Sequence, residues 1–256
     1  MIHIRSLLDA LMHPLSIPLR IKRRASRLDL MDLLVQMAGV SLGQSHAFFD
    51  ELKASSFQNE LEGDIAQIGI SGVQFNPNWF TKKDWHAALY CIIRATMPSA
   101  IVETGVASGI SSAFILRALH DNRKGKLYSI DLPPIPDENG NVPGDMNWTL
   151  PDGVEPGCAI PPQLRYRWEL ITSSSEIALP PLLQRLGQID IFLHDSDHSY
   201  QHMTWEYETA WPHIRAGGLL LSDDIGLNSA MIDFCKHHRH QYNEFERKMG
   251  VVLKDG

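Results

Sequence analysis

The chain has few cysteines, no long apolar run and no excess of positive charge. Its three cysteines, Cys91, Cys158 and Cys235, are scattered and form no C-x-x-C pair, which argues against a disulfide framework and for reduced thiols in the cytoplasm. No stretch approaches the roughly 18 apolar residues that a membrane-spanning helix needs, and residues 1–24 lack the apolar core of a signal peptide. A formal net charge of −7 argues against a general nucleic-acid-binding protein. We therefore expect a soluble, cytoplasmic protein.

From residue 100 onward, strand patterns alternate with helical patterns. A length of 256 residues fits one α/β domain with an N-terminal extension. Such alternation predicts a parallel sheet with helices on both faces and ligands at the carboxyl ends of its strands. The parallel strands are expected near residues 100–104, 126–131, 168–172, 189–195 and 218–223, and two closing antiparallel strands at about residues 238–246 and 249–254.

A glycine loop lies between the first strand and the helix that follows it. Gly105 and Gly109 lack a Cβ atom, so a ligand can approach the main chain and the helix can lie close to the strand. The helix that begins near Ile110 offers unpaired N–H groups to an anion. The spacing of the two glycines differs from the G-x-G-x-x-G dinucleotide fingerprint, which disfavours a dinucleotide enzyme. An ordinary strand–turn–helix without a ligand remains an alternative.

Asp131 ends the second strand, 26 residues after Gly105. At that position a carboxylate can accept hydrogen bonds from both hydroxyl groups of a ribose. A single Asp at a strand end is also a common turn residue. The combination with the glycine loop favours the ribose-binding interpretation.

The fourth and fifth strands end in clustered acids. Asp195 and Asp197 follow one strand, and Asp223 and Asp224 follow its neighbour. Carboxylates at one edge of a sheet repel each other unless a cation, a proton or a cationic ligand offsets their charge. Oxygen ligands of this kind suit a hard cation such as Mg²⁺.

Histidines offer a weaker zinc hypothesis. His194 and His198 have the spacing of an H-E-x-x-H motif, but the acid between them is misplaced and His194 is expected on a strand. His237, His238 and His240 are expected on an exposed edge, and without a partner side chain they support no metal assignment.

The segment from Asp195 to Tyr200, then Gly217-Gly218, an apolar strand and Asp223-Asp224 resembles the metal-dependent class I O-methyltransferases, in particular methyltransferase family 24. The segment Glu103-x-Gly105-x-x-x-Gly109 resembles their motif I. The resemblance covers about residues 75–254. It implies a Rossmann-like sheet of seven strands, mostly parallel, with an antiparallel C-terminal hairpin and helices on both faces. The implied division is a helical N-terminal extension over residues 1–74 and a methyltransferase domain over residues 75–256.

The resemblance also implies S-adenosylmethionine (SAM) as cofactor, Mg²⁺ or another divalent cation, and a hydroxyl-bearing small molecule or sugar as acceptor. His198 and Asp195 would be catalytic, and Asp195, Asp223 and Asp224 would hold the metal. The implied cofactor-binding residues are Glu103, Gly105, Ala107, Gly109, Asp131, Ser174 and Asp195. Catechol-type enzymes have Asp-Asn where this chain has Asp223-Asp224, and their catalytic lysine is absent from the loop that holds His198.

Three alternatives stay open for the activity. A metal-independent methyltransferase would use His198 as the base, a non-catalytic protein would only bind SAM or a nucleotide, and His198 could simply begin a helix.

The basic cluster at residues 20–27 is either a solvated helix face or a contact with a membrane or another anionic carrier. Residues 133–162 form a long aperiodic connection, which predicts a lid or acceptor wall. A homo-oligomer is compatible with the sequence.

Overall fold

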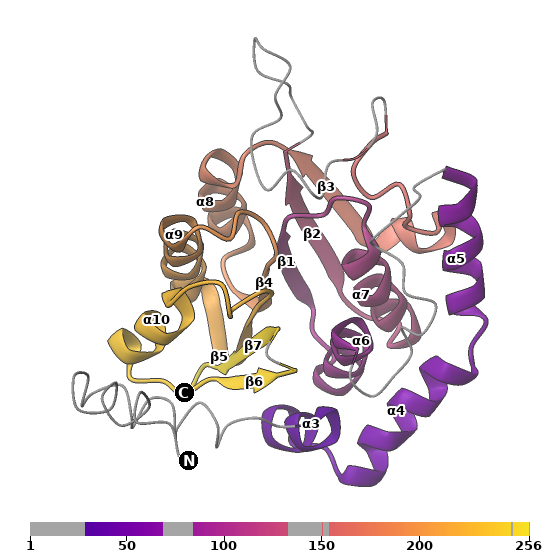
Figure 1. Ribbon diagram of the computed structural model, residues 1–256, viewed down its shortest axis with the longest axis horizontal. Coiled ribbons are helices and arrows are strands. Elements are labelled where there is room, and N and C mark those ends of the chain that lie inside the picture. The colour runs from indigo at the N-terminus through magenta and orange to yellow at the C-terminus, as the bar shows by residue number, and fades with distance from the viewer. Residues whose placement is uncertain (1–28, 69–83, 133–149, 151–153, 247, 256) are drawn as a thin grey trace, which may run out of the picture.

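The computed structural model describes residues 29–68, 84–132, 150, 154–246 and 248–255. Their centre is a seven-stranded sheet in the order β3-β2-β1-β4-β5-β7-β6 (Figure 1). The first five strands of that order are mutually parallel, and β7 pairs antiparallel with both β5 and β6. The strands are β1 (Ala100–Thr104), β2 (Lys126–Asp131), β3 (Trp168–Thr172), β4 (Ile189–His194), β5 (Ile214–Ser222), β6 (Asn243–Phe245) and β7 (Met249–Leu253). This confirms the predicted mostly parallel sheet with its C-terminal hairpin.

Helices cover both faces of the sheet, as Figure 1 shows. Alternate residues of a strand point to opposite faces, so Ile101 packs into one apolar cluster and Val102 into the other. The first cluster includes side chains of α6 (Trp85–Thr96) and α7 (Ile110–Asp121), and the second those of α8 (Ser175–Leu186), α9 (Tyr200–Ala210) and α10 (Ala230–His238). Among the helices of the described residues, none combines the length and apolar character needed to cross a membrane.

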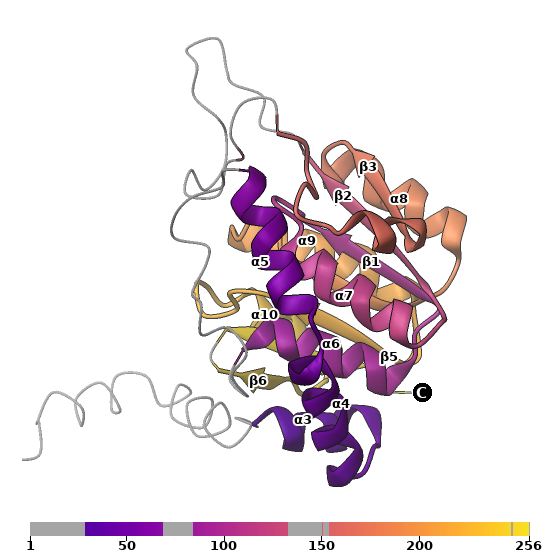
Figure 2. The same ribbon diagram turned by 90° about the vertical axis from the view of Figure 1, so that its right-hand side faces the viewer.

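Three N-terminal helices extend the cluster around α6 and α7. They are α3 (Leu30–Ala38), α4 (Leu42–Ala54) and α5 (Phe57–Ile68), which run beside α6 and α7 in both views (Figures 1 and 2). The ring of Phe57 contacts Phe114 of α7 edge to face at 5.2 Å, and Arg94 of α6 pairs with Glu51 of α4 at 2.8 Å. The described part of the predicted N-terminal extension is thus helical and shares a hydrophobic core with the sheet.

The C-terminal region differs from the sequence prediction. Helix α10 ends at His238 and β6 begins only at Asn243, so the strand expected from about residue 238 is shorter and is preceded by a helix. Met231, Phe234 and Cys235 are buried, and their spacing lies on one helical face. His237 and His238 consequently stand in the last turn of a helix and not on a strand at the sheet edge.

The predicted lid is only partly described. Residues 133–149 and 151–153 lie outside the described residues, whereas Pro156, Ala159 and Ile160 are buried. The amides of Gly157 and Ala159 donate to the carbonyl oxygens of Ala107 and Ser108 at 2.9 Å each. Residues 154–161, followed by the short 3-10 helix η2 (Pro162–Arg167), therefore pack against the glycine loop. The prediction that this connection is a lid or an acceptor wall stays a prediction.

Candidate active site

The glycine loop is shaped by close contacts with the rest of the chain. Gly105 has φ 81°, and a Cβ atom there would lie 2.0 Å from the carbonyl oxygen of Asp195. Gly109 has φ 87°, and its Cβ would lie 2.7 Å from the Cα of Gly157. Neighbouring main chain therefore leaves no room for a side chain at either glycine. The sequence prediction explained these glycines by the approach of a ligand and by close packing of the helix on the strand.

Glu103 lies fully buried beneath this loop. Its carboxylate accepts hydrogen bonds from the hydroxyls of Ser111 and Ser112 of α7, at 2.8 and 2.6 Å, and of Ser129 of β2, at 2.8 Å. Burial raises the pKa of Glu103 to about 7, although the three hydroxyls oppose this shift. Glu103 of β1 is therefore hydrogen-bonded to β2 and to the start of α7. We had expected its carboxylate to contact a cofactor directly.

Asp131 ties the end of β2 to the glycine loop. Its Oδ2 accepts from the amide of Ala107 at 2.8 Å and its Oδ1 from the amide of Leu132 at 2.9 Å. Burial raises the pKa of this carboxyl group. Each carboxylate oxygen keeps a further lone pair, so Asp131 can still accept from a ribose hydroxyl.

Ser174 lies beside Asp131 because the amide of Ser173 donates to the Asp131 carbonyl oxygen at 3.0 Å. Ser174 occupies the N-cap position of α8, where its side chain makes no capping hydrogen bond. Ser174 is half-buried. The residues predicted to line the cofactor pocket thus lie at the carboxyl ends of β1, β2 and β3 and, for Asp195, of β4.

The predicted metal ligands gather at the ends of β4 and β5, but not all of them converge. Ligand atoms of Asp195, His198 and Asp223 all lie within 4.8 Å of one another. Asp224, which has φ 46° and begins a turn with Leu227, is not in this group. His198 thus takes the third place that the sequence prediction gave to Asp224.

This cluster holds two buried polar atoms without a hydrogen-bond partner, Nε2 of His198 and Oδ1 of Asp223. Burial and then the charge of Asp223 raise the pKa of Asp195 well above its usual range. Burial also raises the pKa of Asp223. Unpartnered buried polar atoms are rare in proteins, so the cluster has the character of a ligand site.

His198 is held as a neutral base would be. Burial, and then the neighbouring His194, lower its pKa, against the opposing effect of the acids around it. Its backbone carbonyl oxygen accepts from Asn228 Nδ2 at 2.8 Å, which joins the loop after β4 to the loop after β5. The imidazole therefore presents an unprotonated nitrogen at neutral pH.

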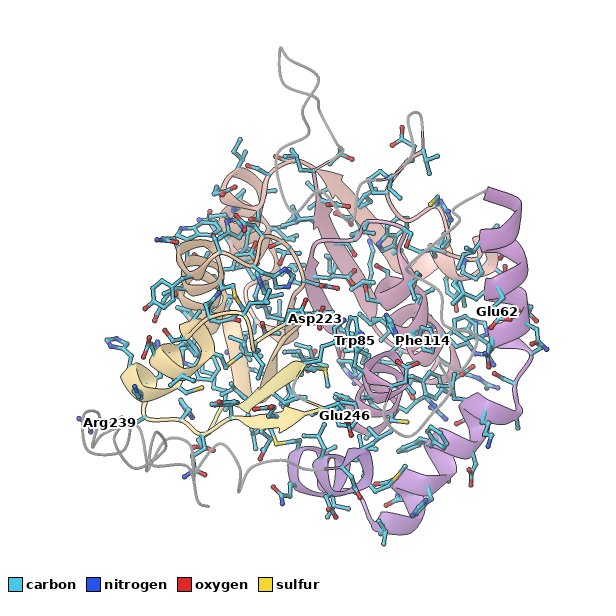
Figure 3. All side chains as sticks on the ribbon, viewed as in Figure 1. Glu62, Trp85, Phe114, Asp223, Arg239 and Glu246 are labelled. Carbon is cyan, nitrogen blue, oxygen red and sulfur yellow. The ribbon has the colours of Figure 1, made fainter. Side chains whose placement is uncertain are left out.

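Lys248 is a site residue that sequence reasoning missed. Its Nζ lies 3.6 Å from Asp223 Oδ2 and 5.2 Å from the centre of the Trp85 ring, and Figure 3 shows Trp85 next to Asp223 near the centre of the molecule. Trp85 is half-buried and packs against the core cluster of α6 and α7. Lys248 reaches this place because β7 pairs with β5, with Gly250 opposite Ser222, and no local sequence signal announces it.

A buried polar network supports the end of β4 from below. Glu206 of α9 binds His194 Nδ1 at 2.6 Å and His202 Nε2 at 2.9 Å, and accepts from the Thr104 hydroxyl at 2.5 Å. Burial raises the pKa of Glu206, but the hydrogen bonds to the two histidines outweigh it and bring the pKa below its usual range. His194 is bound into this network, and among the described residues it joins no group of potential metal ligands. The zinc hypothesis for His194 and His198 gains no support.

Comparisons with known proteins agree with this geometry. Residues 102–225 match methyltransferase family 24, whose model is described as a methyltransferase domain. None of the curated proteins compared with the chain matches its sequence.

Two solved structures share the fold. The Podospora anserina methyltransferase PaMTH1, solved with bound S-adenosylhomocysteine (SAH), is 13% identical with a TM-score of 0.50, and the match covers 81% of this chain and 95% of that one. A candidate O-methyltransferase from Klebsiella pneumoniae is 12% identical with a TM-score of 0.50, and the match covers 86% of this chain and 100% of that one. The chain thus shares the fold of these two structures, and its residues 102–225 are similar in sequence to methyltransferase family 24.

Proposed function

We propose that the chain transfers the methyl group of SAM to a hydroxyl oxygen of a small molecule or sugar. The observation that carries this proposal is the cluster of Asp195, His198 and Asp223, with unpartnered buried atoms on His198 and Asp223. It lies at the carboxyl ends of β4 and β5, next to the glycine loop that follows β1. This is the crevice where ligands of such sheets bind.

Cofactor binding would be divided among three strand ends. Asp131 would accept from the ribose hydroxyls, Ser174 would lie near adenine, and the loop from Gly105 to Gly109 would follow the rest of the cofactor. Ala107 and Asp195 would complete the pocket, and Glu103 would hold the loop in place. PaMTH1, which shares the fold, was solved with the product form of this cofactor.

In the reaction, the acceptor oxygen forms a bond to the methyl carbon while the carbon–sulfur bond of the sulfonium breaks. Holding donor and acceptor in line can supply roughly 7–11 kcal/mol of the barrier reduction. The acceptor hydroxyl proton passes to Nε2 of His198, whose lowered pKa keeps it unprotonated near neutral pH. Neutral SAH and a methyl ether are the products.

A divalent cation fits the residues of the cluster. Asp195 and Asp223 would hold it together with a third ligand. With the carboxylate of Asp224 as that ligand, after a change of its side chain, His198 would stay free as the base; with the imidazole of His198 as that ligand, the cation and not His198 would promote loss of the acceptor proton. When bound, such a cation favours the deprotonated acceptor hydroxyl. The orphaned Oδ1 of Asp223 supports this proposal, and Mg²⁺ or Mn²⁺ suits the carboxylates.

The second candidate is a metal-independent methyltransferase, which one observation favours. The ammonium group of Lys248, 3.6 Å from Asp223, already offsets part of the acidic charge. In that case Asp195 and Asp223 would order the loop and share a proton, and His198 alone would deprotonate the acceptor.

Thermal unfolding with SAH, with and without Mg²⁺, tests cofactor and metal together. A ligand that binds only the folded state raises the melting temperature, so SAH alone should raise it, and Mg²⁺ should raise it in wild type but not in Asp223→Asn. The absence of any SAH effect would contradict the methyltransferase proposal. A Mg²⁺ effect that persists in Asp223→Asn would contradict only the metal site.

Once an acceptor is found, His198→Ala separates the two candidates. Loss of a general base typically lowers kcat by about 10²–10⁴-fold, with SAH affinity unchanged. Activity that is lost in EDTA and restored by Mg²⁺ supports the metal-assisted reaction. Full activity of the wild type in EDTA, with an inactive His198→Ala variant, supports the metal-independent one.

The acceptor side of the site has exposed apolar residues. Tyr200 begins α9 and is 40% exposed, and Leu227 in the loop after β5 is 62% exposed. They flank the joined loops of His198 and Asn228 and offer a surface to the apolar face of a ring or sugar.

The proposal also includes a cytoplasmic location, contact of the basic cluster at residues 20–27 with an anionic carrier, and self-association.

A further inference from the structure

A second group of potential metal ligands lies away from the candidate active site. Glu208 of α9 and His237 and His238 in the last turn of α10 have ligand atoms that all lie within 4.8 Å of one another. His238 Nε2 lies 2.9 Å from Glu208 Oε2, and the two histidine rings are 4.9 Å apart at 81°. Glu208 and His237 are exposed and His238 is half-buried, so solvent ions reach all three.

Aromatic packing fixes the positions of the two helices. Phe234 of α10 contacts Tyr207 of α9 at 5.5 Å and Trp211 at 5.2 Å, ring centre to ring centre. The ring of His238 lies 4.5 Å from that of Phe234. The donor atoms are therefore presented by a preorganised helix pair, not by flexible loops, which lowers the entropic cost of binding.

Local electrostatics also favour a cation here. His237 and His238 lie in the last turn of α10, where the helix dipole attracts positive charge, and Glu208 of α9 lies beside them. The basic neighbours are Lys236, which pairs with Asp233 at 3.4 Å, and the exposed Arg239 at the end of the helix. Arg239, labelled in Figure 3, marks this corner at the outer edge of the molecule, well away from Asp223.

We propose that Glu208, His237 and His238 form a transition-metal site that cross-links α9 and α10. Two imidazoles and one carboxylate select borderline cations such as Zn²⁺, Co²⁺ or Ni²⁺ over Mg²⁺. Three protein ligands leave one position for water in a four-coordinate zinc site. The bound ion would hold the carboxyl end of α10, the helix that follows the loop of Asp224 and Asn228. The competing interpretation is a surface ion pair of Glu208 with His238, which stabilises little.

Zinc titration by calorimetry tests the site without any assay of activity. We would use the Asp195→Ala/Asp223→Ala background with excess Mg²⁺, which removes and masks the acidic cluster. The expected result is about one Zn²⁺ per chain, with affinity reduced more than about tenfold by His237→Ala or Glu208→Gln. His240→Ala is the matched control, because His240 lies on the same corner, pairs with Asp255 at 3.5 Å and is outside the group.

Thermal unfolding gives a second readout on the wild-type chain. Because Zn²⁺ can also bind the acidic cluster, it should raise the melting temperature of His237→Ala less than that of wild type, and that of His240→Ala as much as that of wild type. The same stoichiometry and affinity in His237→Ala as in wild type would overturn the proposal, as would the absence of zinc binding in the background variant together with no zinc effect on wild-type unfolding.

Discussion

At the scale of single residues, several polar side chains in the candidate site already make hydrogen bonds within the protein. Asp131 fastens the glycine loop through Ala107, and Glu103 is surrounded by three serine hydroxyls. Only His198 and Asp223 combine a place in the cluster with buried atoms that lack a partner. Ligand-binding experiments on variants of these two residues therefore test the site most directly.

Asp131→Ala should weaken SAH binding by about 1–3 kcal/mol, because the ribose hydroxyls and the Ala107 amide both lose their acceptor. Calorimetric titration measures the change, and circular dichroism checks the fold. Asp131→Asn keeps one carbonyl acceptor and should lie between the two. Wild-type affinity in a folded Asp131→Ala protein would remove Asp131 from the cofactor pocket.

Lys248→Met should tighten divalent-cation binding at the acidic cluster. The ammonium group lies 3.6 Å from Asp223 and competes with a bound cation, although its partial exposure screens it to about 0.2–1 kcal/mol, a few-fold in affinity. Mn²⁺ titration monitored by electron paramagnetic resonance gives the dissociation constant. Weaker Mn²⁺ binding in the variant would show that Lys248 supports the site instead of competing with a metal.

At the scale of elements, the Glu103 network joins β1, β2 and α7. The indole N–H of Trp168 on β3 donates to Ser129 at 2.9 Å and extends the network to a third strand. A buried carboxyl group whose pKa is raised makes this junction sensitive to pH.

The pKa of Glu103 rises from its ordinary 4.5 to about 7 in the folded protein. The folded state then binds the proton more tightly than the unfolded state, so the contribution to stability is complete below pH 4.5 and is lost as pH rises to about 7. At 1.36 kcal/mol per unit, the loss is about 3 kcal/mol.

The wild type should therefore lose stability relative to Glu103→Gln as pH rises from 4.5 to about 7. Above that range, the difference in free energy of unfolding between the two proteins should no longer change with pH. Urea unfolding at several pH values measures the difference. A constant difference across that range would mean that the three serines keep Glu103 ionised throughout.

At the scale of the whole molecule, the N-terminal helices belong to the core around α6 and α7. Phe57 is 1% exposed and packs on Phe114. Phe57→Ala should destabilise the protein by about 3–5 kcal/mol, with SAH affinity at the folded protein unchanged. The matched control is Leu42→Ala, since Leu42 is 53% exposed and its loss should change the free energy of unfolding by less than about 0.5 kcal/mol. Equal effects of the two substitutions, read by denaturant unfolding, would show that the N-terminal helices are a separable appendage.

The positions of the parallel strands along the chain, the mostly parallel sheet and the place of Asp131, Asp195 and Asp223 at strand ends followed from the sequence alone. Apolar periodicity and strand-end acids are local signals, and the crossover rule turns them into one common edge. The strands at 126–131 and 168–172 agree with the structure to the residue.

Only tertiary structure decided which side chains meet. His198, and not Asp224, joins Asp195 and Asp223 in the group of potential metal ligands. Lys248 lies near Asp223 because β7 pairs antiparallel with β5. Glu208 lies near His237 and His238 because α9 packs on α10. These contacts join residues far apart in the chain, and their geometry depends on helix packing and strand register, which no local pattern of residues encodes.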